Sequence, residues 1–172
     1  SQYKNWYIGP NLESIPNKTF QSSLWYRKEF DLPRDRRGDN TVLRFDGINF
    51  RADIWLNGSR LARKDTLMGS FRIFSFEVSD IVKESDNVLA VEVFPPRPGE
   101  LTIGFVDWNP RPPDNNMGLW REVNLICTGP VSLVSPVVES DLDQSNENAD
   151  LTVRTMLVNR SDQLRSGFVR GE

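Results

Sequence analysis

Apolar side chains occupy every second position from residue 48 to residue 56, and an asparagine–glycine pair begins at residue 57. Alternation with a period of two predicts a strand with one buried face, because successive side chains of a strand point to opposite sides. Asn57-Gly58 predicts a tight hairpin, since both residues tolerate a positive φ, and the chain would return antiparallel over 59–63. The apolar members are Ile48, Phe50, Ala52, Ile54 and Leu56, and the polar-face members are Asn49, Arg51, Asp53, Trp55 and Asn57.

Further short segments of this kind predict more strands, and no long segment has helical periodicity. Short strands at near-regular spacing, with polar turns between them, favour an antiparallel sandwich of two sheets. Residues 79–83 predict one helical turn at most, which Ser79 can cap. The other expected strands lie at 24–32, at 71–73 with the neighbouring Phe74 and Phe76, at 88–94 and at 119–127.

The character of the chain changes at Gly129-Pro130, so we expect a first domain over 1–129 and the truncated start of a second β domain over 130–172. About forty residues cannot enclose a core of their own, and unpaired strand edges recruit partners. We therefore expect the later strands to fold over the first domain or to pair between chains. The tail has apolar segments at 131–138, 151–158 and 167–169 and a polar run at 141–150.

Composition narrows the chemistry that the chain can perform. The 172 residues carry 21 Lys and Arg against 24 Asp and Glu, and this net charge of −3 argues against a nucleic-acid partner or a polybasic membrane patch. The absence of histidine excludes His-dependent triads and His metal sites, and the single cysteine, Cys127, excludes an internal disulfide. No apolar run is long enough to span a membrane, and no glycine-rich phosphate loop occurs. We expect no metal and no cofactor, which leaves carboxylate chemistry or binding by aromatic and amide groups.

A long loop from Pro95 to Pro113 holds six of the eleven prolines. A loop of this length in a compact domain is usually functional or disordered, and its aromatic residues argue against disorder. Asp107, Trp108 and Asn109 set an acceptor, a flat aromatic face and an amide side by side, which suits a sugar ring. The alternative is that Trp108 packs the loop onto the sandwich while Asp107 caps a turn.

Asp114-Asn115-Asn116 follows this loop and also has two interpretations. It could offer polar groups to sugar hydroxyls, or it could form an ordinary turn, which these residue types favour. Asp107 and Asp114 belong to the same stiff segment, but no neighbouring residue in the sequence would make either one a general acid, so we do not expect a catalytic pair. Cys127 shares a face with apolar neighbours and is expected to be a small buried residue rather than a nucleophile.

Six stretches between residues 23 and 129 stand in an order and spacing that is specific as a set. They are Trp25–Phe30, Leu43–Gly47, Ala52–Gly58, Gly69–Phe71, Asp86–Val91 and Gly118–Val123. Together they resemble the amino-terminal sugar-binding domain of family 2 glycoside hydrolases, which include β-galactosidases, β-mannosidases, β-glucuronidases and exo-β-glucosaminidases. The resemblance implies a jelly-roll β-sandwich of the galactose-binding-domain type. It also implies that the tail is the start of an immunoglobulin-like domain.

The loop is most similar to the exo-β-glucosaminidase and β-mannosidase branch, through residues 107–110, 112–114 and 117–118. By this resemblance Asp107 binds sugar hydroxyls and Trp108 walls the subsite for the terminal sugar, with Asn109 and Asp114 as further carbohydrate-binding residues. Many members carry a histidine shortly after the Leu-Asn-Gly turn, where this chain has Arg63-Lys64-Asp65. That departure loosens any link to the β-galactosidase branch.

The resemblance places the catalytic glutamates in a downstream barrel, so no catalytic residue is expected in this chain. It implies a retaining β-glycosidase as the larger protein, a terminal β-linked sugar and the barrel as partners, and a periplasmic or extracellular location. Two alternatives stay open, because the fold supports all three functions. One is an autonomous carbohydrate-binding module, and the other is a structural or interaction module whose exposed tryptophans meet a protein partner.

Overall fold

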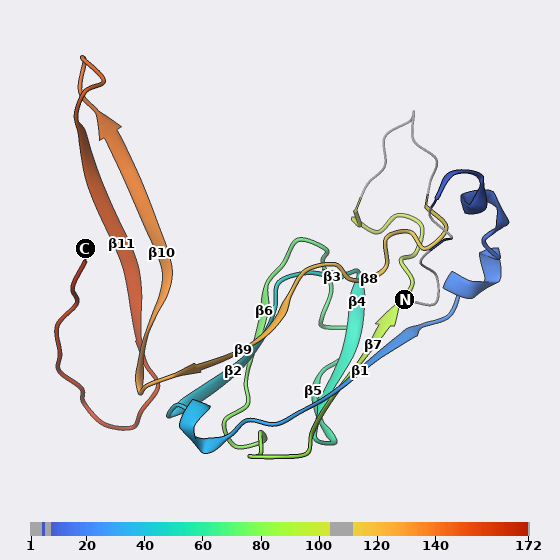
Figure 1. Ribbon diagram of the computed structural model, residues 1–172, viewed down its shortest axis with the longest axis horizontal. Helices are drawn as coiled ribbons and strands as arrows, with labels where there is room; N and C mark the ends of the chain where they lie inside the picture. The colour runs from blue at the N-terminus through green and yellow to red at the C-terminus, as the bar shows by residue number, and fades with distance from the viewer. Residues whose placement is uncertain (1–4, 6–7, 104–111, 172) are drawn as a thin grey trace.

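The computed structural model describes residues 5, 8–103 and 112–171, and Figure 1 shows its elements. Eleven strands and three short 3₁₀ turns make up the described part, which contains no α-helix. None of these helical turns is long and apolar enough to cross a membrane. The elements are η1 (Gly9–Ser14), η2 (Asn17–Phe20), β1 (Leu24–Phe30), η3 (Arg34–Arg36), β2 (Asn40–Phe45), β3 (Ile48–Asn49), β4 (Arg51–Leu56), β5 (Ser59–Ala62), β6 (Phe74–Glu77), β7 (Asn87–Phe94), β8 (Gly118–Leu119), β9 (Val123–Thr128), β10 (Val131–Leu142) and β11 (Ala149–Asn159).

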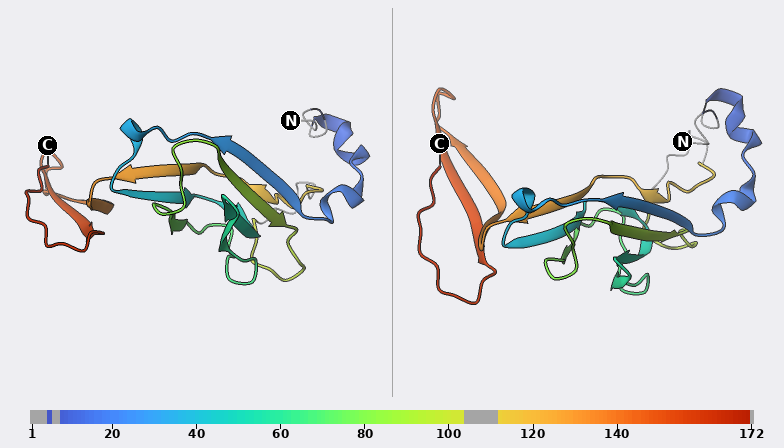
Figure 2. Two further views of the ribbon diagram at one scale, coloured as in Figure 1. Left: turned by 90° about the horizontal axis from the view of Figure 1, so that it is seen from below. Right: turned by 60° about the horizontal axis from the view of Figure 1, so that its bottom comes forward.

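Two antiparallel sheets form a sandwich, which confirms the predicted jelly-roll class (Figure 2). One sheet has the order β1-β7-β4-β5 and the other the order β6-β2-β9, while β3 and β8 form a short extra ladder. The predicted alternation builds the core, because Ile54 and Val93 have no exposed surface and face Phe45 from the opposite sheet. Asn57 and Gly58 have φ values of 52° and 84°, and these positive values allow the tight β4–β5 turn that the sequence predicts.

Three predicted strands are placed differently. The strand expected over 48–56 is divided at Phe50, so that β3 pairs with β8 while β4 pairs with β7. The strand expected over 119–127 is likewise divided, into β8 and β9. The strand expected over 71–73 lies instead at Phe74–Glu77, because these residues pair with β2, whereas the preceding three follow a turn at Gly69. No strand occurs near 167–169 within the described range 112–171.

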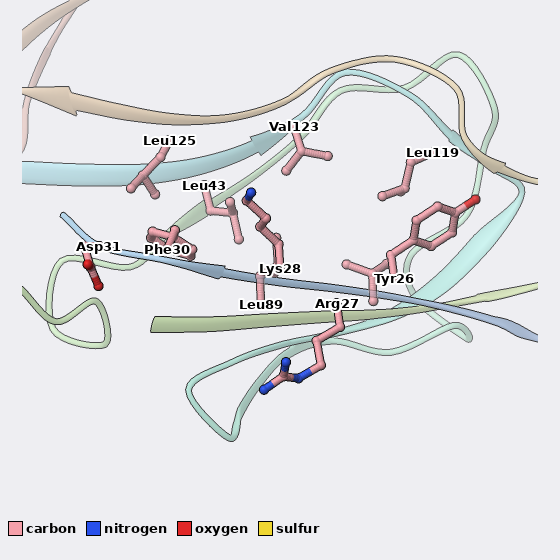
Figure 3. Close-up of a pocket in the computed structure, with 11 residues that line it drawn as sticks. Tyr26, Arg27, Lys28, Phe30, Asp31, Leu43, Leu89, Leu119, Val123 and Leu125 are labelled. Atoms are coloured by element: carbon pink, nitrogen blue, oxygen red, sulfur yellow. The ribbon is translucent and has the colours of Figure 1, made fainter. Parts of the chain in front are cut away.

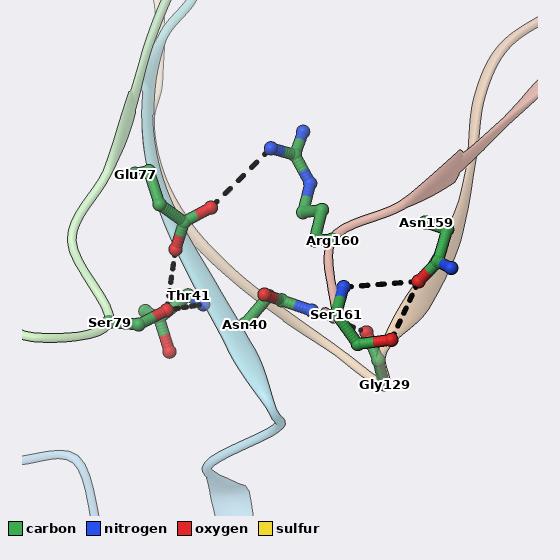
Figure 4. A network of polar contacts seen from close by, with 8 residues as sticks. All are labelled: Asn40, Thr41, Glu77, Ser79, Gly129, Asn159, Arg160 and Ser161. Atoms are coloured by element: carbon green, nitrogen blue, oxygen red, sulfur yellow. Dashed lines mark hydrogen bonds and ion pairs between the residues drawn. The ribbon is translucent and has the colours of Figure 1, made fainter. Parts of the chain in front are cut away.

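The β10–β11 hairpin projects away from the sandwich, as both figures show, and among the described residues its strands pair with each other. At its base, Asn40 Nδ2 donates to the carbonyl oxygen of Gly129 at 2.9 Å, and Arg160 lies 3.5 Å from Glu77 (Figure 4). The expectation that these strands fold over the first domain is therefore wrong, because their local pairing extends them outward. Pairing between chains and the domain boundary at 129/130 stay predictions.

Candidate functional site

The predicted sugar-binding residues belong to the loop that follows β7. Asp107, Trp108 and Asn109 lie outside the described residues, so their roles stay predictions. Asp114 is described at the carboxyl-terminal stem of this loop. Its Oδ1 accepts a hydrogen bond from the backbone N–H of Asn116, and its carbonyl oxygen accepts one from that of Met117, both at 2.9 Å. Asp114 thus forms the turn that was the alternative interpretation, and its contact with a sugar stays a prediction.

Asn49 fixes this stem to the sandwich. Its side chain has no exposed surface, and its Nδ2 donates to the carbonyl oxygens of Asn115 at 3.1 Å and Asn116 at 2.8 Å. Its Oδ1 accepts from the hydroxyl of Ser70 at 2.6 Å. Both N–H groups and the oxygen of the amide are therefore used. Losing a partner at such a buried group costs about 1–3 kcal/mol, so the position of the stem is strongly preferred.

Arg51 fixes the other stem of the same loop. Its guanidinium is buried and forms an ion pair with Glu100, whose second carboxylate oxygen accepts from the backbone N–H of Arg97 at 2.6 Å. Asn49 and Arg51 are separated by one residue, so a single short segment holds both stems. The alternation pattern placed both residues on a polar face turned to solvent. The structure buries them because the stems of the loop cover that face.

Asn49, Arg51 and the two stems together form the loop base, and their contacts hold the loop in position. The Asn49 amide uses all of its hydrogen-bonding groups, and the buried guanidinium of Arg51 is paired with the Glu100 carboxylate. Within residues 8–103 and 112–171, no cluster of three or more Cys, Asp or Glu side chains could hold a metal ion. The loop base can therefore hold a segment in a fixed place, and any contact with substrate comes from the residues that it presents.

A polar hollow of about 470 Å³ lies where β2 ends and β9 begins, next to the segment that joins β8 to β9. Trp120 forms one wall, and its Nε1 donates to the carbonyl oxygen of Ser70 at 2.8 Å. Ser70 therefore links the hollow to Asn49. Trp120 and Asp46 belong to two separate sequence motifs, and no local pattern predicts their juxtaposition, because it depends on pairing between distant segments. The hollow is lined by Arg44, Asp46, Ile73, Trp120, Arg121 and Glu122.

An apolar cleft of about 490 Å³ opens between the edge strands β1 and β9 (Figure 3). Core side chains such as Leu43 and Val91 line it, and Lys28 of β1 lies on the cleft side with Tyr26 and Phe30. Most of this lining is apolar and its polar side chains all come from β1 and the residue after it, so we do not assign the sugar site here. A charged residue that points inward on an edge strand is a device that discourages edge-to-edge pairing.

Similarity to known proteins places the chain in a family. The family model described as glycosyl hydrolase 2 galactose-binding domain-like matches residues 1–101. The chain is 37% identical over 169 residues to the exo-β-D-glucosaminidase of Arthroderma benhamiae, covering 96% of this chain and 19% of that protein. It is 34% identical over 161 residues to the exo-β-D-glucosaminidase of Amycolatopsis orientalis, covering 93% and 15%. The chain thus spans less than a fifth of the length of these relatives.

Solved structures give a matching result. The exo-chitosanase CsxA of Amycolatopsis orientalis superposes with a TM-score of 0.81 at 33% identity, over 88% of this chain and 18% of that one. The β-D-mannosidase of Dictyoglomus thermophilum superposes with a TM-score of 0.66 at 23% identity, over 87% and 21%, which shows a shared fold. In both cases most of this chain corresponds to a small part of a much longer protein.

Proposed function

The chain belongs to the galactose-binding-like domains of family 2 glycoside hydrolases, and from this membership we propose that it is the non-catalytic sugar-binding domain of an exo-acting β-glycosidase. The observation that carries the proposal is the similarity to two exo-β-D-glucosaminidases over more than nine tenths of the chain. In the larger protein, a catalytic barrel outside these residues supplies the two carboxylates of a retaining mechanism. The substrate is a chain that ends in a β-linked sugar, with glucosamine as the first candidate.

The proposed contribution of this domain is the loop after β7. Asp107 accepts hydrogen bonds from sugar hydroxyls, Trp108 stacks against the sugar ring, and Asn109 and Asp114 add polar contacts. The fixed stems support this role, because Asn49 and Arg51 restrict where the loop emerges from the sandwich. A binding group is useful in a subsite only when its support keeps it close to the productive position.

Export to the periplasm or the medium belongs to the same proposal. Fractionation of cells that express the complete natural gene tests it, and we expect the protein outside the cytoplasm. Retention of the complete protein in the cytoplasm would contradict this part of the proposal without affecting the role of the domain.

Two measurements on the purified chain test the role of the domain. We expect no hydrolysis of p-nitrophenyl β-D-glucosaminide or β-D-mannoside, and activity that co-purifies with the chain would contradict the non-catalytic role. We also expect the NMR signal of the Trp108 indole N–H, assigned with Trp108→Phe, to stay unmoved by glucosamine, mannose or galactose. The reason is that part of the terminal-sugar subsite belongs to the barrel. A saturable shift of this signal would favour the alternative of an autonomous carbohydrate-binding module.

A further inference from the structure

The hollow next to Trp120 combines a polar floor with an exposed apolar rim. Phe71 is 70% exposed and meets the Trp120 ring edge to face, with 5.4 Å between the ring centroids. Ile73, which lines the hollow, is 56% exposed. Gly47 permits this arrangement, because a Cβ there would lie 2.6 Å from the indole nitrogen of Trp120. The rim therefore offers an aromatic ring and an aliphatic side chain to the apolar face of a ligand.

The floor of the hollow offers a fixed donor and a fixed acceptor. Arg44 Nε donates to Asp46 Oδ1 at 2.6 Å, and Asn124 Nδ2 donates to Asp46 Oδ2 at 3.3 Å. These contacts hold the Asp46 carboxylate, whose side chain is still 16% exposed. A hydroxyl can donate one hydrogen bond and accept others, so adjacent hydroxyls of a sugar match a neighbouring carboxylate and guanidinium.

Glu122 adds an acceptor of a different kind. Its backbone carbonyl is paired with the N–H of Asp46 at 3.0 Å, which fixes the main chain at the edge of the hollow. Its carboxylate lines the hollow and makes no hydrogen bond or ion pair with any of the described residues. An unpaired carboxylate next to hydroxyl-binding groups complements a ligand that carries both hydroxyls and a cation.

We propose that this hollow binds an amino-sugar ring. The C–H face of the ring packs on Phe71 and Ile73, its hydroxyls lie between Arg44 and Asp46, and its ammonium group pairs with Glu122. The choice of an amino sugar rests on the proposed function, whereas the hollow is built entirely from this chain. The described lining comes from residues 44, 46, 73 and 120–122, whereas Asp107, Trp108 and Asn109 lie outside the described residues, so the two proposed sugar contacts are followed through different signals, Trp120 and Trp108.

The other sheet supplies a matched control. Trp25 is 59% exposed and stacks on Trp55 with 5.3 Å between the ring centroids, and Arg60 lies 5.1 Å from the Trp55 ring. This stack resembles the Phe71–Trp120 pair in composition, but neither tryptophan lines any of the hollows described here. Trp25→Ala therefore removes an exposed aromatic ring of similar size without touching the proposed site.

The experiment is an NMR titration of the full chain with the β-1,4-linked glucosamine disaccharide, with cellobiose as the uncharged comparison. We expect the Trp120 indole N–H signal, assigned with Trp120→Phe, to shift saturably with both disaccharides. The dissociation constant should be lower for the amino sugar than for cellobiose. Phe71→Ala should weaken binding about fivefold or more, which is the size expected for an aromatic contact. Glu122→Gln should remove the preference for the amino sugar over cellobiose, and Trp25→Ala should change nothing. Phe71 at the rim and the control residue Trp25 are both exposed, so their variants should keep the signal dispersion of the folded chain.

Two results would overturn the inference. One is the absence of a saturable shift at Trp120 with either disaccharide, which would leave the hollow as a surface for a protein partner. The other is equal weakening by Phe71→Ala and Trp25→Ala, which would show non-specific contact. Neither result bears on the proposed function, because that proposal is tested by hydrolysis and by the Trp108 signal. Conversely, a shift at Trp120 would stand even if the loop after β7 proved to have no role in sugar binding.

Discussion

The sandwich and the β10–β11 hairpin are both antiparallel, yet they bury their apolar side chains to very different extents. Phe45, Ile54 and Val93 have no exposed surface in the sandwich, whereas Val153 and Leu157 in the hairpin are 66% and 55% exposed. The difference shows that two neighbouring segments can pair as a hairpin without burying their apolar side chains. Burial requires a second layer, and among the described residues the hairpin has none.

The largest expected effect is a difference in the free energy of unfolding between a core substitution and a hairpin substitution. Phe45→Ala should lower the free energy of unfolding by about 3–5 kcal/mol, because it opens a cavity where Phe45 meets Phe76 in the core. Leu157→Ala in the hairpin should cost less than about 0.5 kcal/mol, because its side chain is already largely in water. Urea denaturation followed by circular dichroism measures both values. Similar losses at the two positions would mean that the hairpin is covered in solution.

A smaller effect compares the loop base with the base of the hairpin. Asn49→Ala should cost about 2–5 kcal/mol, because it removes a fully buried amide that makes three hydrogen bonds, to Asn115, Asn116 and Ser70. Asn40→Ala removes one donor, to Gly129 at the start of the hairpin, and should cost about 1–2 kcal/mol. The same denaturation experiment measures both variants. A smaller loss for Asn49→Ala than for Asn40→Ala would contradict the account of the fixed loop stem.

The smallest effect lies at the tip of the hairpin. The side-chain amide of Asn148 and the hydroxyl of Ser145 donate to the Asp143 carboxylate, and they lower its pKa from 3.8 to about 2. The folded form therefore favours the carboxylate. This contribution to stability is present above pH 3.8 and is lost as the pH falls through about 2.

Carbon-detected NMR titration of the Asp143 carboxyl group checks this value. Asn148→Ala should raise the pKa toward 3.8, and the amide signals of the sandwich should not follow the titration, because Asp143 lies on the exposed turn. An unchanged pKa in this variant would show that another group holds the carboxylate.

The core of the sandwich could be predicted from the sequence because the alternation of side chains and the turn residues are visible within short segments. Alternation identified the buried positions Ile54 and Leu56, and Asn57-Gly58 identified the turn. The segment around Phe71 and Phe74 is different, because apolar residues occupy both odd and even positions, and a strand there could turn either set toward the core. Only the pairing of Phe74–Glu77 with β2 decides between these sets, and that pairing involves a distant part of the chain.

The candidate site was less predictable because it depends on contacts between segments that are distant in the sequence. Asn49 and Arg51 read as solvent-facing polar residues, because nothing in their neighbourhood shows that the distant loop stems cover them. The hollow joins Asp46 to Trp120 through backbone pairing across more than seventy residues of sequence. The resemblance to family 2 glycoside hydrolases correctly gave the fold and the family, but the motifs alone did not bring these side chains together.

In the proposed function, the loop after β7 helps to bind the terminal sugar. The most direct measurement uses a chimera in which this chain replaces the matching region of the Amycolatopsis orientalis exo-β-D-glucosaminidase, assayed on the glucosamine disaccharide. Asp107→Ala and Trp108→Ala should each lower kcat/KM about tenfold or more, while Trp25→Ala should leave it unchanged. An active chimera whose kcat/KM is unaffected by both loop substitutions would contradict the claim.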